Sequence, residues 1–316
     1  MQSFFQEIGW FQERKSTIPI PLPGQVIKKK NGILQQLLWK NHVAEVFLEN
    51  VTKKKYLYVE EKISNLFSSL NAPNPKLKNR EAICEALEFA VTELPSTNPS
   101  DIYQHVIYRL YIREYKRSKA EQSWVRAGGE GVELFIERHY VDVFRPYEIT
   151  IRALLTRNAK ALALDEMGLS GQVGNSKLDI ALYGQHQGRQ IIFGGIHCKA
   201  SLAERVSDDV PCSEAMMHRG LLSVLYTFDS KSFPPPRGDL INRGELGSPG
   251  QPSDKRKYIE DHGSFEACFS YNLRTVPSKD GTKSGKKIYV SSLTREDDIF
   301  PTYIIQKWND YRKNLA

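Results

Sequence analysis

The chain has 316 residues, 40% of them hydrophobic and 26% charged, which is an ordinary balance for a globular protein. A chain of this length buries enough apolar surface to fold without disulfides or a structural metal. Its four cysteines lie far apart and form no CxxC pair, which excludes zinc ribbons and thioredoxin-like motifs. The N-terminus lacks a signal-peptide pattern, and no apolar run is long enough to span a bilayer. We therefore expect a cytoplasmic protein without a membrane partner.

The charge balance points to a polyanionic partner. There are 44 Lys and Arg residues against 37 Asp and Glu, a net charge of +7. Basic clusters occur at 28–30, 53–55, 113–119 and 283–287. Each cluster has the charge to neutralise phosphates of a nucleic acid, although a charge run usually faces water.

The first part of the chain predicts an extended arm followed by helices. Three prolines alternate with other residues over 17–27, so this segment cannot be helical. Apolar residues at helical spacing then indicate an amphipathic helix over 83–94 that stops at Pro95, and a second helix after the turn-rich segment 96–100. Residues 1–118 are therefore expected to form an N-terminal arm and a mainly helical section.

Residues 119–316 predict an α/β core. A third helix is expected over 121–140, and alternation of residue types over 178–183, followed by the apolar run 191–199, indicates two strands. Further elements complete the core: a long irregular loop at 232–257, strands at 265–271 and 287–291, and a final helix containing Trp308 and Tyr311.

One more helix is expected between the second strand and the long loop. Ser213 is a suitable N-cap residue, because its side chain can accept a hydrogen bond from the first turn. Met217, Leu221, Val224 and Leu225 follow it at helical spacing. The pattern therefore predicts a helix that begins at Ser213 and runs through Leu225.

A carboxylate and a lysine stand out on the two predicted strands. Asp179 interrupts the first strand, and Lys199 ends the second. A charged group at the end of a buried strand is costly unless it is paired or binds a metal. Phosphodiester cleavage uses this combination, because a carboxylate holds Mg²⁺ and a lysine orients water or offsets developing charge. A purely structural Asp–Lys ion pair would give the same spacing.

The strand spacing sets one geometric condition on this site. A simple hairpin around 184–190 would pair Asp179 with the neighbourhood of Gly195. Lys199 would then lie about four residues, or roughly 13 Å, farther along the second strand. A bend or bulge at Gly194 and Gly195, or another strand arrangement, must close the gap.

Asp179, Lys199 and the segment after them resemble type II restriction endonucleases of the PD-(D/E)xK superfamily that cut CCGG or CCNGG sites. These enzymes lack an acid two positions before the lysine and recruit a glutamate from a later helix. Here His197 occupies that earlier position, and Glu214 is the natural replacement. The resemblance implies a mixed central sheet flanked by helices, Mg²⁺ as cofactor, and Asp179 and Glu214 as metal ligands.

The resemblance also implies an upstream acid. The segment 123–136 is similar to the family's helix that brings another carboxylate near the metals. By position this role falls to Glu133, with Glu130 as the competitor. Both glutamates would also suit the polar face of any surface helix.

Between Lys199 and Glu214 the family places its base-reading residues. An acid and an arginine at five and six positions after the lysine correspond to Glu204 and Arg205. A carboxylate can accept from cytosine N4, while arginine pairs with guanine O6 and N7. Many relatives have a basic residue at the position of Ala203, so one guanine contact is expected from elsewhere. Further candidates for DNA contact are Ser201, Ser207, Asp208 and Asp209.

These expectations combine into a Mg²⁺-dependent endonuclease acting on double-stranded DNA at a short palindrome that contains CCGG. A palindrome implies a two-fold homodimer, because each subunit then meets the same half-site. Residues 17–30 or 232–257 are expected to read the flanking bases. Two alternatives are a structure-specific repair or resolving nuclease of the same superfamily, and a non-catalytic DNA-binding protein.

Overall fold

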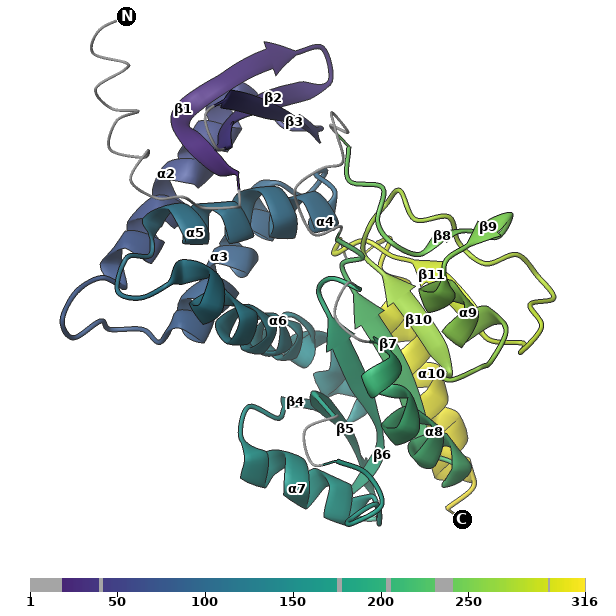
Figure 1. Ribbon diagram of the computed structural model, residues 1–316. Coiled ribbons are helices and arrows are strands. Elements are labelled where there is room, and N and C mark those ends of the chain that lie inside the picture. Colours follow the sequence, from purple (N-terminus) through teal and green to yellow (C-terminus); the bar gives the residue numbers. More distant parts are fainter. Residues whose placement is uncertain are drawn as a thin grey trace, which may run out of the picture.

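The computed structural model describes residues 19–39, 42–174, 178–202, 206–230, 241–294 and 296–315 (Figure 1). An N-terminal section of a small sheet and several helices lies beside a core built on a larger sheet. Helix α6 (Ala120–Phe144) connects them, since it packs on α3 of the first section and on β4, β6 and α10 of the core. Within the described residues, no helix has both the length and the apolar composition needed to cross a membrane.

The N-terminal section begins with a three-stranded antiparallel sheet, ordered β1 (Ile20–Lys29), β2 (Gly32–Trp39) and β3 (His42–Glu49). The sequence predicted an extended arm here, and the extended conformation is confirmed for 20–27. The sheet itself was not predicted. Its register shifts between Pro21 and Val26, and this irregularity accommodates proline, which cannot donate to a regular ladder.

The helices that follow include the predicted ones as α3, the turns after residue 98, and α6, whereas α2 was not predicted. They are α2 (Lys53–Ser69), α3 (Asn79–Glu93), α4 (Pro99–Asp101), the π-helical turn η1 (Ile102–Tyr108), α5 (Arg109–Glu114) and α6. Glycine lets α3 and α6 approach closely, because a Cβ on Gly131 would lie 2.6 Å from Ile83 Cγ2. This contact explains why α6 has a glycine at position 131.

The core contains a six-stranded sheet in the order β11-β10-β7-β6-β5-β4. Strands β4, β5 and β6 are antiparallel, whereas β6, β7, β10 and β11 are parallel. The predicted α/β class with a mixed central sheet is thereby confirmed. Its elements are β4 (Ile149–Ala153), α7 (Arg157–Glu166), β5 (Ile180–His186), β6 (Arg189–Lys199), α8 (Val210–His218), β7 (Leu222–Thr227), β10 (Ala267–Ser270), β11 (Lys287–Val290) and α10 (Ile299–Lys313), with short helical turns η2 (Arg145–Tyr147) and η3 (Val206–Asp208).

The predicted loop at 232–257 has regular structure in its described part. Strands β8 (Gly247–Ser248) and β9 (Gln251–Pro252) form a small hairpin, and α9 (Asp254–Glu260) follows it. Residues 231–240 lie outside the described residues. Predicted strands at 265–271 and 287–291 are confirmed as β10 and β11, and the final helix is confirmed as α10.

The helix predicted from Ser213 through Leu225 was wrong. Helix α8 begins three residues earlier, ends at His218, and is followed by the buried strand β7. Because β7 is buried on both faces, it has no alternation, and periodicity alone does not separate such a strand from a helix. Ser213 lies inside α8, where its Oγ is 2.6 Å from Ser223 Oγ.

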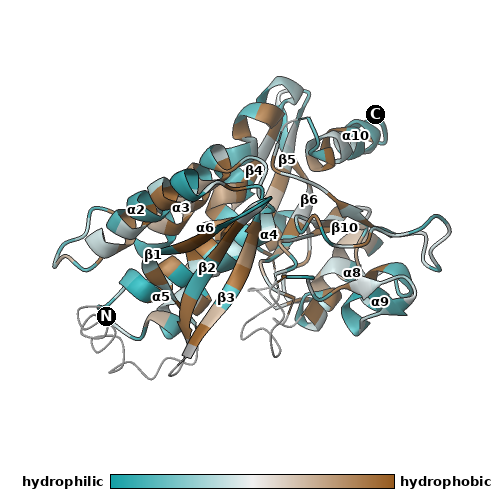
Figure 2. Ribbon diagram, turned by 90° about the horizontal axis from the view of Figure 1, so that it is seen from above, coloured by the Kyte–Doolittle hydropathy of each residue, from teal (hydrophilic) through white to brown (hydrophobic). Residues whose placement is uncertain are grey.

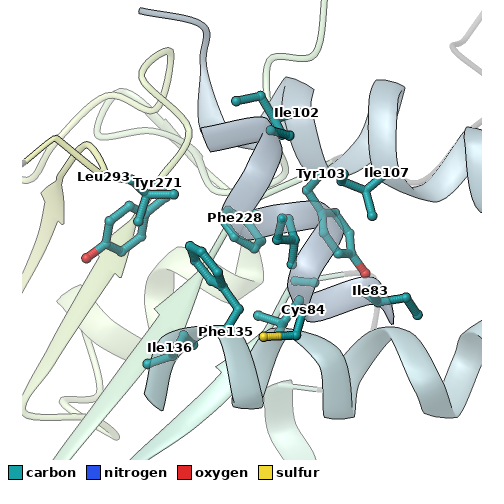
Figure 3. Close-up of a cluster of buried hydrophobic side chains, with 14 of the residues drawn as sticks. Ile83, Cys84, Ile102, Tyr103, Ile107, Phe135, Ile136, Phe228, Tyr271 and Leu293 are labelled. Carbon is teal, nitrogen blue, oxygen red and sulfur yellow. The ribbon is translucent and has the colours of Figure 1, made fainter. Parts of the chain in front are cut away.

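Both faces of the large sheet are covered by helices. One face packs against α6 and α10, and the other packs against α7, α8 and α9. Figure 2 shows hydrophobic residues concentrated in the strands and inner helix faces, while peripheral α9 is largely hydrophilic. Buried side chains from both sections meet in one cluster, in which Phe228 and Tyr271 of the core lie beside Phe135 and Tyr103 (Figure 3). The two sections therefore share a hydrophobic core.

Candidate functional site at the end of strands β5 and β6

The strand register brings Asp179 and Lys199 together. Ile180 pairs with Ile196, and a register shift between Leu182 and Tyr183 leaves Phe193 as an extra residue on β6. The backbone N–H of Cys198 donates to Asp179 Oδ2 at 2.9 Å, and Lys199 Nζ lies 3.6 Å from the same oxygen. The bulge expected beside Gly194 is thus present, and it shifts the register by one residue. The long side chain of Lys199 covers the rest of the distance to Asp179.

A second carboxylate holds Lys199. Asp209 is the N-cap residue of α8 and is 3% exposed, and its Oδ2 lies 2.7 Å from Lys199 Nζ. Burial alone would lower the pKa of Lys199, but Asp179 and Asp209 outweigh burial and raise it above the ordinary lysine value. Lys199 is therefore a fixed cation between two acids.

A second lysine reaches Asp179 from helix α7. Lys160 Nζ donates to Asp179 Oδ1 at 3.0 Å. Burial acts to raise the pKa of Asp179, yet Lys199, Lys160 and the Cys198 N–H together hold it below the ordinary value. Asp179 is therefore ionised, with both carboxylate oxygens engaged.

Helix α6 contributes Glu133 to the same site. Its side chain is 8% exposed, and its Oε2 is buried without a hydrogen-bond partner among the described residues. Burial, assisted by the negative charge of Asp179, raises the pKa of Glu133 to about 8, against the opposing effect of Lys160 and Lys199. A buried carboxyl group with a raised pKa and an unpartnered oxygen is typical of a functional site.

The structure also separates Glu133 from its competitor Glu130. Arg80 Nη1 donates to Glu130 at 3.1 Å, and Arg126 Nε donates at 2.7 Å. Despite partial burial, these two arginines lower the pKa of Glu130. Glu130 is thus satisfied by two arginines, whereas Glu133 Oε2 has no hydrogen-bond partner among the described residues.

Glu214 has a different environment from the one predicted. Its Oε1 accepts a hydrogen bond from Ser264 Oγ at 3.0 Å. Glu214 follows Asp209 by five positions on α8, which corresponds to a rotation of about 140° and a rise of about 7.5 Å. In the part of the chain that the structure describes, Asp209 and not Glu214 is the α8 acid that contacts Lys199.

The predicted base-reading residues lie in the connection between β6 and α8. Glu204 and Arg205 fall outside the described residues. Ser201 and Asp208 are half-buried on either side of them, and Asp208 belongs to the short turn η3. Their role in DNA contact stays a prediction.

We refer to five charged residues together as the β5–β6 cluster: Glu133, Lys160, Asp179, Lys199 and Asp209. Its three carboxylates provide oxygen ligands only, the donor type that Mg²⁺ prefers. The unpartnered Oε2 of Glu133 shows that the site has unused coordinating capacity. Among the described residues, no three His, Cys, Asp or Glu side chains already form a group that could hold a metal ion. The oxygen donors of the cluster nevertheless have the chemistry that a divalent cation such as Mg²⁺ prefers.

Sequence reasoning missed two members of this cluster. Asp209 was considered only for base reading, and its position just before Val210 and Pro211 was the available signal. Proline is favoured in the first turn of a helix and Asp is favoured as its N-cap, so this pattern marks the true start of α8. Lys160 carries no comparable signal, because one lysine in a polar helix is common.

Similarity to known proteins identifies the family of this chain. Residues 155–297 match the family model described as BsaWI restriction endonuclease type 2. The type II restriction enzyme AgeI of Thalassovita gelatinovora is 50% identical to this chain over 269 residues, which are 83% of this chain and 95% of that enzyme. The chain belongs to the type II restriction endonucleases.

The fold agrees with this membership. A crystal structure of a specific AgeI–DNA complex covers 86% of this chain and 98% of that chain, with 47% identity and a TM-score of 0.79. The mixed sheet with flanking helices is therefore the restriction-endonuclease fold. As a member of this family, the protein is a sequence-specific deoxyribonuclease.

Proposed function

We propose that this restriction endonuclease uses Mg²⁺ to hydrolyse DNA at a short palindrome that contains CCGG. The observation that supports it best is the convergence of Asp179, Lys199 and Asp209, with distances of 3.6 and 2.7 Å from the lysine to the two acids. Glu133 adds a third buried carboxylate from a separate helix.

Glu133, Asp179 and Asp209 would hold the ion, because hard divalent cations prefer carboxylate oxygens. In this proposal Asp209 takes the metal-binding role that the family resemblance assigned to Glu214. Bound there, Mg²⁺ would polarise the scissile phosphate and lower the pKa of a water molecule. Lys199 orients that water and offsets the negative charge that develops on the phosphate.

The base-reading role remains with Ser201, Glu204, Arg205 and Asp208. This segment begins directly after Lys199, so its position is tied to the cleavage site by a short connection. Glutamate and arginine are suited to cytosine and guanine in the major groove. Because each half of a palindrome is identical, we propose that two copies act on one site as a two-fold homodimer.

Plasmid digestion followed by sequencing of the fragment ends tests the recognition site. We expect discrete bands whose ends all fall in one palindrome containing CCGG, and no cleavage when EDTA replaces Mg²⁺. Ends without a common sequence, or a preference for branched DNA, would contradict the proposal. Light scattering of the protein with a duplex carrying the site tests the two-to-one stoichiometry.

A further inference from the structure

The two oxygens of Asp179 differ in how they are held. Oδ2 accepts from the backbone N–H of Cys198 at 2.9 Å and lies 3.6 Å from Lys199 Nζ. Oδ1 accepts from Lys160 Nζ at 3.0 Å. A metal ion that binds Asp179 must therefore compete with one of two lysines or with a backbone amide.

Lys199 is held more firmly than Lys160. Lys199 lies in the interior of the sheet at the end of β6, and Asp209 binds its ammonium at 2.7 Å as a second acid. For Lys160, Asp179 is the acid that the described residues provide. Lys160 lies in the first turns of α7, beside Arg157, which is exposed. Its long side chain can swing toward water without breaking a second ion pair within the described part of the chain.

From this asymmetry we propose that Lys160 is a displaceable counter-ion of the metal site. Before metal binds, Lys160 neutralises Asp179 and keeps its carboxylate in place. When a divalent cation binds, Lys160 releases Oδ1 and moves toward solvent, while Lys199 stays between Asp179 and Asp209. Lys160 is thus a positioning residue that weakens metal affinity in the resting enzyme. This inference rests on the proposed function, since it takes Asp179 as a metal ligand.

The physical basis is the exchange of one cation for another at a buried carboxylate. Coulomb attraction in a partly buried site is several times stronger than in water, so a lysine at 3.0 Å from Oδ1 competes effectively with a metal ion. Removing its charge leaves Asp179 still bound to Cys198 N–H and close to Lys199. The carboxylate is then less neutralised and binds a divalent cation more tightly.

Direct Mn²⁺ binding to the full-length protein without DNA tests this inference. Lys160→Met keeps a long flexible side chain and removes the charge. We expect its Mn²⁺ affinity, measured by calorimetry or by the electron paramagnetic resonance of free Mn²⁺, to rise on the order of tenfold. The Mg²⁺ concentration for half-maximal cleavage should fall in parallel. Lys160→Arg keeps the charge and should remain within about twofold of the unmodified protein in its Mn²⁺ affinity.

Arg157→Met is the matched control, because it removes one positive charge from the exposed surface of the same helix. It should change Mn²⁺ affinity by less than about twofold. Equal or weaker Mn²⁺ binding by Lys160→Met would overturn the inference, as would an equal gain in Arg157→Met. Thermal melting without metal checks that each variant is folded, and Lys160→Gln provides a second neutral side chain if Lys160→Met is not.

Asp179→Asn separates this inference from the proposed function. If Asp179→Asn binds Mn²⁺ as tightly as the unmodified protein, Asp179 is not a ligand and both proposals fail. If Asp179→Asn loses binding while Lys160→Met gains none, the proposed function stands and the counter-ion role of Lys160 is rejected.

Discussion

Two ionic clusters in this enzyme differ in how completely their charges are paired. The β5–β6 cluster lies in the core, and a junction cluster of Glu49, Asp101 and Arg274 joins the N-terminal section to the core. Every side-chain nitrogen of Arg274 has a partner: Nε and Nη2 donate to Glu49, Nη1 and Nη2 donate to Asp101, and Nη1 also donates to the Asn242 carbonyl. Such complete pairing is what a structural ion cluster requires.

The β5–β6 cluster is less completely paired. Glu133 Oε2 is buried without a partner among the described residues, and lysines rather than arginines provide the positive charge. A lysine ammonium on a flexible chain moves more easily than a planar guanidinium held by several hydrogen bonds. The contrast lies in the unpartnered Glu133 and in Lys160, whose ammonium pairs with a single acid among the described residues, and this is why we propose a catalytic role for the β5–β6 cluster and a structural role for the junction cluster. It also argues against a purely structural Asp179–Lys199 pair.

The largest effect is expected from Lys199→Ala. Loss of this ammonium removes the group that orients water and offsets charge, so we expect the single-turnover rate of plasmid cleavage to fall on the order of 10³-fold. Binding of the same DNA in Ca²⁺ should remain, because the base-reading segment is unchanged. A rate within tenfold of the unmodified enzyme would show that Lys199 is only a structural partner of Asp179.

Arg274→Met tests the structural side of the contrast. The substitution leaves Asp101 buried without its main cation, and we expect the free energy of unfolding to fall by about 2–3 kcal/mol. Urea denaturation followed by fluorescence measures this change. At a temperature where both proteins are folded, the cleavage rate should be unchanged within about threefold. A large loss of rate with normal stability would place the junction cluster in the catalytic machinery.

Asp209→Asn and Glu214→Gln form a matched pair within α8. Asp209 contacts Lys199 at 2.7 Å, so Asp209→Asn should lower the cleavage rate on the order of 10²-fold. Glu214→Gln keeps the hydrogen bond to Ser264 and should change the rate by less than about threefold. The opposite order of effects would return the metal-binding role to Glu214 and remove Asp209 from the proposal.

Sequence periodicity predicted the helices and the two site residues whose positions follow from a local pattern. Helices α3 and α6 follow from apolar spacing, and the acid and lysine at the ends of β5 and β6 follow from strand alternation. The resemblance to a family added Glu133. Strand β7 was missed because burial on both faces removes its alternation.

Sequence patterns did not predict the contacts between elements that are distant along the chain. The ion pair of Asp209 with Lys199 depends on how α8 docks beside β6, and the pair of Lys160 with Asp179 depends on the position of α7. The junction cluster joins residues separated by 173 and 225 positions. Such pairings are set by tertiary packing, which local propensity does not encode.

A further effect expected is the pH dependence contributed by Asp101. Burial raises the pKa of Asp101 from 3.8 to about 6, although Arg274 opposes this shift. Because the folded-state pKa lies above the unfolded value, the stabilising contribution is complete below about pH 4 and is lost as pH rises through 6. We expect this loss to be about 2–3 kcal/mol in the free energy of unfolding, because each pKa unit corresponds to about 1.4 kcal/mol. Urea denaturation between pH 4 and pH 7 measures it, and Asp101→Asn, which cannot ionise, is the control. The unfolding free energy of the unmodified enzyme should decline relative to Asp101→Asn across this range. A difference that stays constant with pH would show that Arg274 compensates the burial of Asp101 fully, and the junction cluster would then be the more completely paired of the two in its energetics as well as in its geometry.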